Sequence, residues 1–96
     1  MEKYRIREEY TCDEENALGE VYEVHRDEIV GYANTIDEAI SIIIKAFVDN
    51  IEEYHEPDAE DYKIETNTYP YEIVDLTDEQ VRHINREGRK RRWEDN

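Results

Sequence analysis

The sequence predicts an α+β fold: an antiparallel sheet of three to five strands, with one long helix packed on a face and a short C-terminal helix. Two observations support this class. The segment Thr35–Tyr54 has the three-and-four spacing of apolar residues that is typical of a helix with one buried face. The segments before it alternate between apolar and polar residues and are joined by short connections, which favour antiparallel strands. We expect residues 1–96 to form one domain with a modest core, to which eight tyrosines can contribute.

The first strand is predicted over Lys3–Thr11, where apolar and polar residues alternate. Glu8 interrupts the apolar face of this strand and indicates an edge or a strand end. The polar run Cys12–Asn16 predicts a turn or loop.

Two further strands are predicted before the long helix. Glu20–His25 alternates again, and Arg26-Asp27 is predicted to be a hairpin turn into a third strand, Glu28–Ala33. Gly31 within that strand indicates a bulge or a close approach to the helix.

The long helix begins at a capping box. The hydroxyl of Thr35 is expected to accept from the backbone N–H of Glu38, and the Glu38 carboxylate to reach back to the Thr35 N–H. The predicted buried face comprises Ile36, Ile40, Ile43, Phe47, Ile51 and Tyr54. The predicted solvent-exposed face comprises Glu38, Ser41, Lys45, Asp49 and Glu52. The charges on this face exclude a membrane-spanning helix.

After the long helix, Pro57 predicts a loop. Tyr62–Thr66 and Tyr71–Leu76 carry strand residues and form either one bent edge strand or two short ones. A second capping box over residues 76–81 starts a short helix, which we expect Gly88 to end. Residues 86–96 are then a basic tail.

The charge of the chain is large and unevenly placed. The chain has 27 acidic and 12 basic residues and a net charge of −15. Residues 1–80 carry −18 and residues 81–96 carry +3. Such a charge keeps a protein away from nucleic acid and anionic membranes. Cys12 is the only cysteine, which fits a reducing compartment, and the charged N-terminus does not resemble a signal peptide, so a cytoplasmic protein is expected.

Clustered carboxylates are the candidate partner-binding site. Duplex DNA presents about one negative charge per 1.7 Å of axis, and a small domain with carboxylates along one face can imitate that spacing. A basic or nucleic-acid-binding protein is then the partner; the alternative is an ordinary solvated surface. The predicted partner-binding residues are Asp13, Glu14, Glu15, Glu52, Glu53, Glu56, Asp58, Glu60 and Asp61.

Three other functions have weaker support. The basic run Arg86–Arg92 is a nucleic-acid-binding feature, but the −18 of the preceding residues would repel phosphate. We expect it instead to neutralise a helix C-terminus and fold against the acidic face, or to contact an acidic patch on a partner. Cys12 has no lysine or arginine beside it, so its thiol is a poor nucleophile, and we expect no enzyme and no cofactor.

Two residue groups hold possible metal ligands. The first is Cys12 with Asp13 and Glu14; the second is His55 with Glu56, Asp58 and Asp61. Neither has the spacing of a zinc or EF-hand site, and we assign no metal.

The run Glu28–Ile40 reads as a strand, a threonine cap and a helix. It looks like a unit common in small α+β proteins encoded by phages and mobile elements. In size, acidity and strand–helix order, the chain resembles anti-CRISPR proteins and other DNA-mimic inhibitors from those elements. The resemblance implies a non-enzymatic inhibitor in the bacterial cytoplasm that binds a defence nuclease, such as a CRISPR effector, at the surface that takes DNA or guide RNA.

The leading hypothesis is therefore an anti-CRISPR-like protein inhibitor with an acidic, nucleic-acid-mimicking surface. The alternative is an acidic regulatory interaction module, such as an antitoxin-like partner of a basic protein. A metal-binding protein is a third hypothesis. The C-terminal end of the Thr35–Tyr54 helix, which runs into the acidic residues 56–61, is the predicted location of the site.

Overall fold

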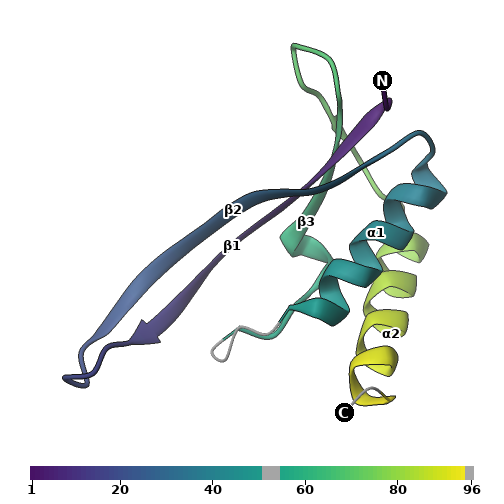
Figure 1. Ribbon diagram of the computed structural model, residues 1–96. Coiled ribbons are helices and arrows are strands. Elements are labelled where there is room, and N and C mark those ends of the chain that lie inside the picture. The colour runs from purple at the N-terminus through teal and green to yellow at the C-terminus, as the bar shows by residue number, and fades with distance from the viewer. Residues whose placement is uncertain (51–54, 95–96) are drawn as a thin grey trace.

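The computed structural model describes residues 1–50 and 55–94. Its four strands form one antiparallel sheet in the order β2-β1-β3-β4, and both helices lie on the same side of the sheet (Figure 1). The predicted α+β fold class is therefore confirmed. In chain order the elements are β1 (Tyr4–Glu15), β2 (Val21–Ala33), α1 (Ile36–Asp49), the 3-10 helix η1 (Ala59–Asp61), β3 (Tyr62–Thr66), β4 (Ile73–Val74) and α2 (Asp78–Glu94).

β1 and β2 form one long two-stranded ribbon instead of three short strands. Twelve residue pairs join them, from Tyr4 opposite Ala33 to Glu15 opposite Val21. β3 pairs with β1 only as far as Glu8, so the rest of the ribbon projects away from the helices (Figure 1). The prediction of a break at Cys12–Asn16 was wrong because the two-residue alternation continues to residue 15.

The ribbon turns at residues 16–20, and the predicted turn at Arg26-Asp27 was wrong. The Asn16 side chain accepts backbone hydrogen bonds at 2.9 and 3.0 Å within this turn. Gly19 has a φ of 80°, a conformation that glycine adopts without strain. Arg26 and Asp27 lie in mid-strand, where pairing with β1 overrides their local preference for a turn.

β1 is a central strand, so Glu8 marks neither an edge nor a strand end. The register between β1 and β2 shifts after Ile6, which faces Gly31. A Cβ atom added to Gly31 would lie 2.8 Å from Cγ2 of Ile42. Gly31 therefore marks both a bulge and a close approach to α1, as the sequence predicted.

α1 begins at its predicted cap. Thr35 Oγ1 accepts from the Glu38 N–H at 3.1 Å, although the Glu38 carboxylate accepts from the Asn34 N–H, also at 3.1 Å, instead of the Thr35 N–H. The helix runs to Asp49, and the last predicted residues, 51–54, lie outside the described part. The buried residues of α1 are Ala39, Ile40, Ile43, Ile44 and Phe47.

The core is built from isoleucine more than from tyrosine. Of the described tyrosines only Tyr62 is buried, because most of the others lie on the ribbon or in loops beyond the reach of the helices. The buried core cluster consists of Ile6, Ala33, Ala39, Ile40, Ile43, Ile44, Phe47, Ala59, Tyr62, Ile64 and Ile84.

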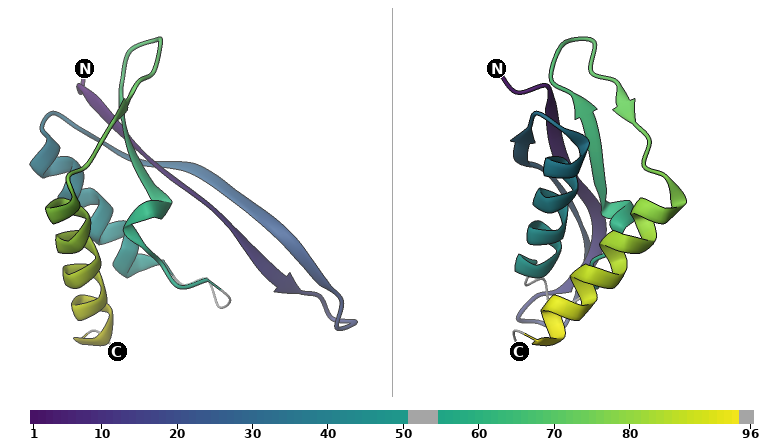
Figure 2. Two further views of the ribbon diagram at one scale, coloured as in Figure 1. Left: turned by 180° about the vertical axis from the view of Figure 1, so that it is seen from behind. Right: turned by 90° about the vertical axis from the view of Figure 1, so that its right-hand side faces the viewer.

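The C-terminal third contains two short strands, β3 and β4, followed by a helix that is longer than expected. The second capping box is confirmed: Thr77 Oγ1 accepts from the Gln80 N–H at 3.1 Å, and Gln80 Oε1 accepts from the Thr77 N–H at 2.9 Å. α2 has 17 residues and continues through Gly88. Gly88 is buried against Phe47, so this glycine allows close helix packing and does not end α2. Figure 2 shows α1 and α2 crossing in front of the sheet.

The expected basic tail forms the second half of α2, and two of its arginines bind other parts of the fold. Arg92 donates to the backbone carbonyls of Phe47 at 3.1 Å and Asn50 at 2.5 Å, at the C-terminal end of α1. Arg89 forms a 3.3 Å ion pair with Asp58. The expectation that basic residues satisfy a helix C-terminus and fold against acidic residues is confirmed for these two side chains.

We predict that Gly88→Ala destabilises the protein. A Cβ at this position would lie 2.6 Å from Cδ1 of Phe47, and overpacking of this kind costs about 1–3 kcal/mol. Alanine normally stabilises a helix interior relative to glycine by about 1 kcal/mol, so the sign of the effect separates packing from helix propensity. Urea unfolding should give a lower free energy of unfolding for Gly88→Ala and little change for Lys90→Ala, on the exposed side of α2. A more stable Gly88→Ala variant would contradict the contact.

Candidate functional site

The residues predicted to bind a partner do not form one surface. We call the side of the sheet that carries the helices the inner face and the opposite side the outer face. Asp13 and Glu15 are exposed on the outer face, near the turn of the ribbon. Glu14 lies on the inner face, where it pairs with Arg26 at 2.9 Å and accepts from the Tyr22 hydroxyl at 3.3 Å.

The predicted site at the end of α1 is only partly open to a partner. Glu52 and Glu53 lie outside the described residues, and Glu56 and Glu60 are exposed. Asp58 caps η1 through the Glu60 N–H at 2.9 Å, besides its ion pair with Arg89. The Asp58 carboxylate therefore serves the fold.

Asp61 is also committed to the fold. Its Oδ2 atom lies 2.6 Å from His55 Nε2 and accepts from the Asp58 N–H at 3.0 Å. The His55 ring stacks on Tyr10, with the ring centroids 3.8 Å apart. The side chains of His55 and Asp61 are only 16% and 14% exposed, so neither offers an open ligand to a partner or a metal.

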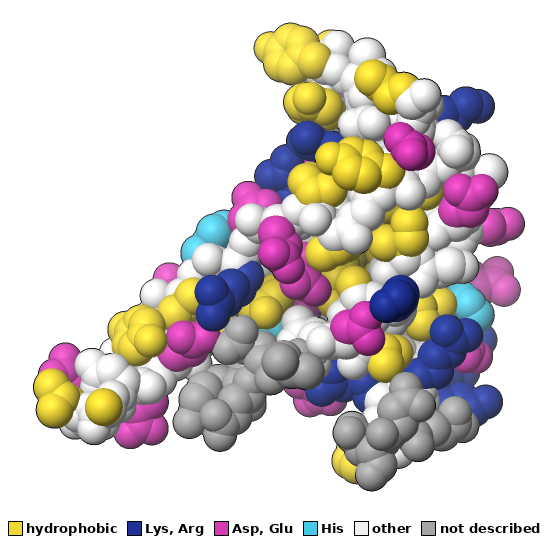
Figure 3. Space-filling view, viewed as in Figure 1, with side chains coloured by type: hydrophobic (Ala, Val, Ile, Leu, Met, Phe, Trp, Pro, Cys, Tyr) yellow, Lys and Arg dark blue, Asp and Glu magenta, His cyan; other side chains and the backbone are white. Residues whose placement is uncertain are grey.

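The structure adds outer-face carboxylates that the sequence analysis missed. Cross-strand neighbours share a face, and Asp13 lies opposite Glu23, while Glu9 lies opposite Asp27. These pairs could not be predicted as long as a turn was placed at Arg26-Asp27. A strand that continues from residues 20–25 through Arg26 and Asp27 places Glu23 and Asp27 on the same face, because side chains two residues apart share a face. In Figure 3, acidic side chains are spread along the ribbon, whereas basic side chains gather over the C-terminal half of α2.

Basic side chains neutralise the outer face at the base of the ribbon. Glu9 receives a hydrogen bond from Lys63 at 3.0 Å, and Asp27 pairs with Arg7 at 3.2 Å. The Lys63 ammonium lowers the pKa of Glu9. Arg5 and Arg7 both donate to Glu65, each at 3.1 Å. This network holds β2, β1 and β3 together where the ribbon leaves the helices.

The far half of the outer face has no such neutralisation. No described cationic side chain forms an ion pair with Asp13, Glu15 or Glu23 within residues 1–50 and 55–94. Facing carboxylates repel, so these residues cost stability in the free protein. Leu18 and Val21 add exposed apolar surface beside them.

The structure does not bring either metal-ligand group considered from the sequence together as a whole: in the second group His55 and Asp61 contact each other, but Asp58 pairs with Arg89. Cys12 is buried on the inner face, whereas the neighbouring Asp13 points to the outer face. The described residues that approach one another best are Glu9, His25 and Asp27, whose ligand atoms lie within 4.8 Å. Because Lys63 and Arg7 already bind the two carboxylates, we assign no metal to this group.

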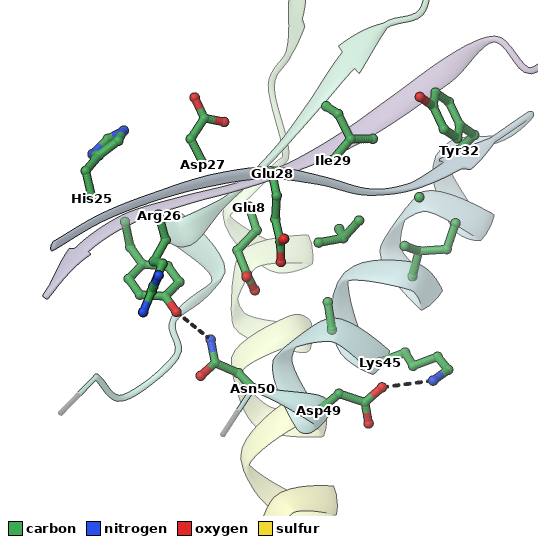
Figure 4. Close-up of a pocket in the computed structure, with 15 residues that line it drawn as sticks. Glu8, His25, Arg26, Asp27, Glu28, Ile29, Tyr32, Lys45, Asp49 and Asn50 are labelled. Carbon is green, nitrogen blue, oxygen red and sulfur yellow. Dashed lines mark hydrogen bonds and ion pairs between the residues drawn. The ribbon is translucent and has the colours of Figure 1, made fainter. Parts of the chain in front are cut away.

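A groove of about 940 Å³ runs along the inner side of β2, with α1 as its other wall. Glu8 and Glu28 are cross-strand neighbours and both point into it from the sheet, whereas His25, Asp27, Ile29 and Tyr32 point to the opposite face (Figure 4). Glu8 is only 8% exposed. Within the described part of the chain, no cationic side chain pairs with Glu8 or Glu28.

Tyr62 lies behind this groove, opposite Glu8 on β3. Its hydroxyl is buried and makes no hydrogen bond of good geometry in the described structure. Burial raises the pKa of Tyr62 far above its ordinary value, and the nearby Glu8 carboxylate raises it further. Glu8 and Tyr62 are thus two polar groups buried side by side without a cation.

Comparison with protein-family models, curated proteins and solved structures found no match. The geometry therefore has to support the function by itself. Among the described residues, no helix is long and apolar enough to cross a membrane.

We predict that Lys63→Met raises the pKa of Glu9. Lys63 depresses this pKa in the folded protein, so the pair stabilises the fold above the unfolded-state pKa of about 4.5 and loses that contribution as the pH falls through the folded-state pKa. Carboxyl NMR titration should find the Glu9 pKa below 4.5 in the wild type and closer to it in the variant. Lys45→Met, which removes the distant Lys45–Asp49 pair, is the control and should leave Glu9 unchanged. Equal Glu9 pKa values in Lys63→Met and the wild type would exclude the contact.

Proposed function

We propose that the chain is a non-enzymatic protein inhibitor of anti-CRISPR type, which binds a nucleic-acid-handling protein through the outer face of the β1–β2 ribbon. The observation that supports this most is the row of carboxylates on that face. Acidic residues occupy five of its eight positions in residues 9–15 and 21–27. These acidic residues are Glu9, Asp13, Glu15, Glu23 and Asp27.

The spacing of these carboxylates is close to that of phosphates on one nucleic-acid strand. Seven strand residues span about 20 Å, so five carboxylates give about one per 4 Å of ribbon. A single DNA strand carries about one charge per 3.4 Å of axis. A cleft lined with Lys and Arg for a phosphate backbone would therefore meet carboxylates at a similar spacing, of which Glu9 and Asp27 are already paired with Lys63 and Arg7.

The fold leaves the charge on the far half of the outer face available to a partner, whereas Lys63 and Arg7 neutralise Glu9 and Asp27 at its base. Residues 8–28 contain nine acidic residues and a single Lys or Arg, Arg26, which pairs with Glu14 on the inner face. A basic partner would relieve the repulsion between Asp13 and Glu23 that the free chain carries. The same charge would steer the encounter and make binding strongly dependent on salt. CRISPR effector nucleases are the candidate partners.

The exposed apolar residues at the ribbon turn favour a second candidate, an acidic regulatory module such as an antitoxin-like partner of a basic protein. Leu18 is 83% exposed and Val21 is 68% exposed. Imitation of a phosphate backbone does not need such residues, whereas a dedicated protein interface uses them as anchors. Loss of binding in Leu18→Ser, combined with weak dependence on salt, would favour this candidate.

We predict that charge reversal of the far outer face abolishes inhibition. The variant Asp13→Lys/Glu15→Lys/Glu23→Lys should bind a target nuclease about 100-fold more weakly at low salt, because three reversed charges each lose about 1 kcal/mol. The measurement is competition between the chain and fluorescent guide RNA or target DNA on a panel of CRISPR effector nucleases, at 0.05 M and about 0.3 M salt.

The matched control is Glu56→Lys/Glu60→Lys/Asp75→Lys, which changes the net charge equally at exposed positions away from the ribbon. It should retain binding within about threefold. Equal losses of affinity in both variants would mean that binding depends on the net charge and not on the outer face of the ribbon. Loss in the control alone would move the site to the acidic loop that the sequence analysis favoured. A panel in which no nuclease is displaced from its nucleic acid would contradict the proposal.

A further inference from the structure

The edge of β2 is open along most of its length. β2 is the terminal strand of the sheet, and among residues 1–50 and 55–94 no strand pairs with its far side. In an antiparallel pair, alternate residues of an edge strand direct their N–H and C=O groups away from the sheet. Long open edges of this kind are templates for an added strand.

The groove described above follows this edge. Eight consecutive residues of β2, His25–Tyr32, line it, which corresponds to about 27 Å of strand. At one end Gly31 meets Ile42 of α1. Toward the turn at residues 16–20, the β1–β2 ribbon projects away from α1 (Figure 1). An extended segment of up to eight residues matches this length.

Glu8 and Glu28 define the chemistry of the groove. Their carboxylates enter from neighbouring strands on the same face (Figure 4), and neither has a cationic partner among the described residues. Glu8 is more than nine-tenths buried, and the Tyr62 hydroxyl is the neutral polar group beside its carboxylate. A Lys or Arg side chain that enters the groove would add the cation that the two carboxylates lack.

We propose that this groove receives an extended segment of a basic partner protein, which adds as a strand to the edge of β2 and places a Lys or Arg side chain between Glu8 and Glu28. The inference rests on the proposed function, since it names the kind of segment that the basic partner contributes. Main-chain hydrogen bonds would supply part of the affinity, and the carboxylate pair would supply the selectivity. The outer and inner faces of the ribbon then contact the same partner from two sides.

A second copy of the chain is a poorer occupant of this edge. Each copy carries a net charge of −15, so two copies repel each other as they approach. A basic segment is attracted by the same charge. Light scattering on the free protein should therefore give a monomer, and a dimer that is lost when Ile29→Pro blocks the edge would overturn the assignment.

The test uses the full chain and three capped peptides. The parent peptide is Thr-Val-Thr-Lys-Thr-Val-Thr; the second replaces Lys with norleucine, and the third carries N-methyl groups on alternate residues of the parent. We expect the parent peptide to shift NMR signals of β2 amides and to protect them from hydrogen exchange. Norleucine should weaken binding by at least about tenfold, because a charge-assisted contact is lost. Methylation of the edge that faces β2 should abolish binding.

Variants of the chain separate a binding role of Glu8 from a structural one. Glu8→Gln should weaken binding of the parent peptide at least about tenfold, because a charge-assisted contact is lost, while the melting temperature of the free protein changes little. The matched control is Glu15→Gln on the outer face, which should change neither. Equal binding of the parent peptide by Glu8→Gln and the wild type, or equal binding of the Lys and norleucine peptides by the wild type, would overturn the proposal.

These outcomes are distinct from those that test the proposed function. If the ribbon variant loses nuclease binding and Glu8→Gln does not, the inhibitor function stands and the strand-addition site fails. If the peptides bind as expected and no nuclease in the panel is inhibited, the strand-addition site stands and the inhibitor function fails.

Discussion

The close packing of α1 against two glycines is the constraint on which the rest of the structure depends. At Gly31 the helix meets the sheet, and a Cβ there would lie 2.8 Å from Ile42. At Gly88 it meets α2, and a Cβ there would lie 2.6 Å from Phe47. α1 is thus held between the sheet and α2, and the core is confined to the part of the sheet that these contacts cover. Because that cover ends where β3 stops pairing with β1, no described residue beyond Glu8 on β1 belongs to the main core cluster, although Cys12 is buried and Tyr10 stacks on His55.

The distribution of cations follows from the same arrangement. Arg7 and Lys63 neutralise carboxylates at the base of the ribbon, and Arg89 and Arg92 bind the loop and the end of α1. Few cations remain for the far end, where Asp13 faces Glu23. Of the net charge of −15, −8 lies on residues 8–28, which hold nine acidic residues and one arginine on a projecting element that contributes little to the core. Repulsion between carboxylates on this ribbon costs less stability than the same repulsion would cost beside the core.

Sequence patterns predicted those features of the fold that depend on residues close together in the chain. The Thr35 cap of α1, the capping box at Thr77 and the close approach at Gly31 could be read from neighbouring residues. Gly88 could not, because its role depends on Phe47, 41 residues earlier in the chain. The turn was misplaced because the turn preference of Arg26-Asp27 is weaker than twelve cross-strand pairs. The acidic site was only partly predictable, since composition does not distinguish a carboxylate that caps η1, such as Asp58, from one that faces solvent.

On the inner face of the sheet, an apolar cross-strand row is followed directly by a polar one, and this change bears on function. Ile6 and Ile64 form one cross-strand row and are both fully buried. In the next inner row Glu8 faces Tyr62 on one side and Glu28 on the other, with two of these polar side chains buried. An apolar row would continue the core at that position and would be more stable. Because sites that bind partners commonly carry such locally unfavourable groups, the polar row at Glu8 is the observation on which the proposed strand-addition site rests.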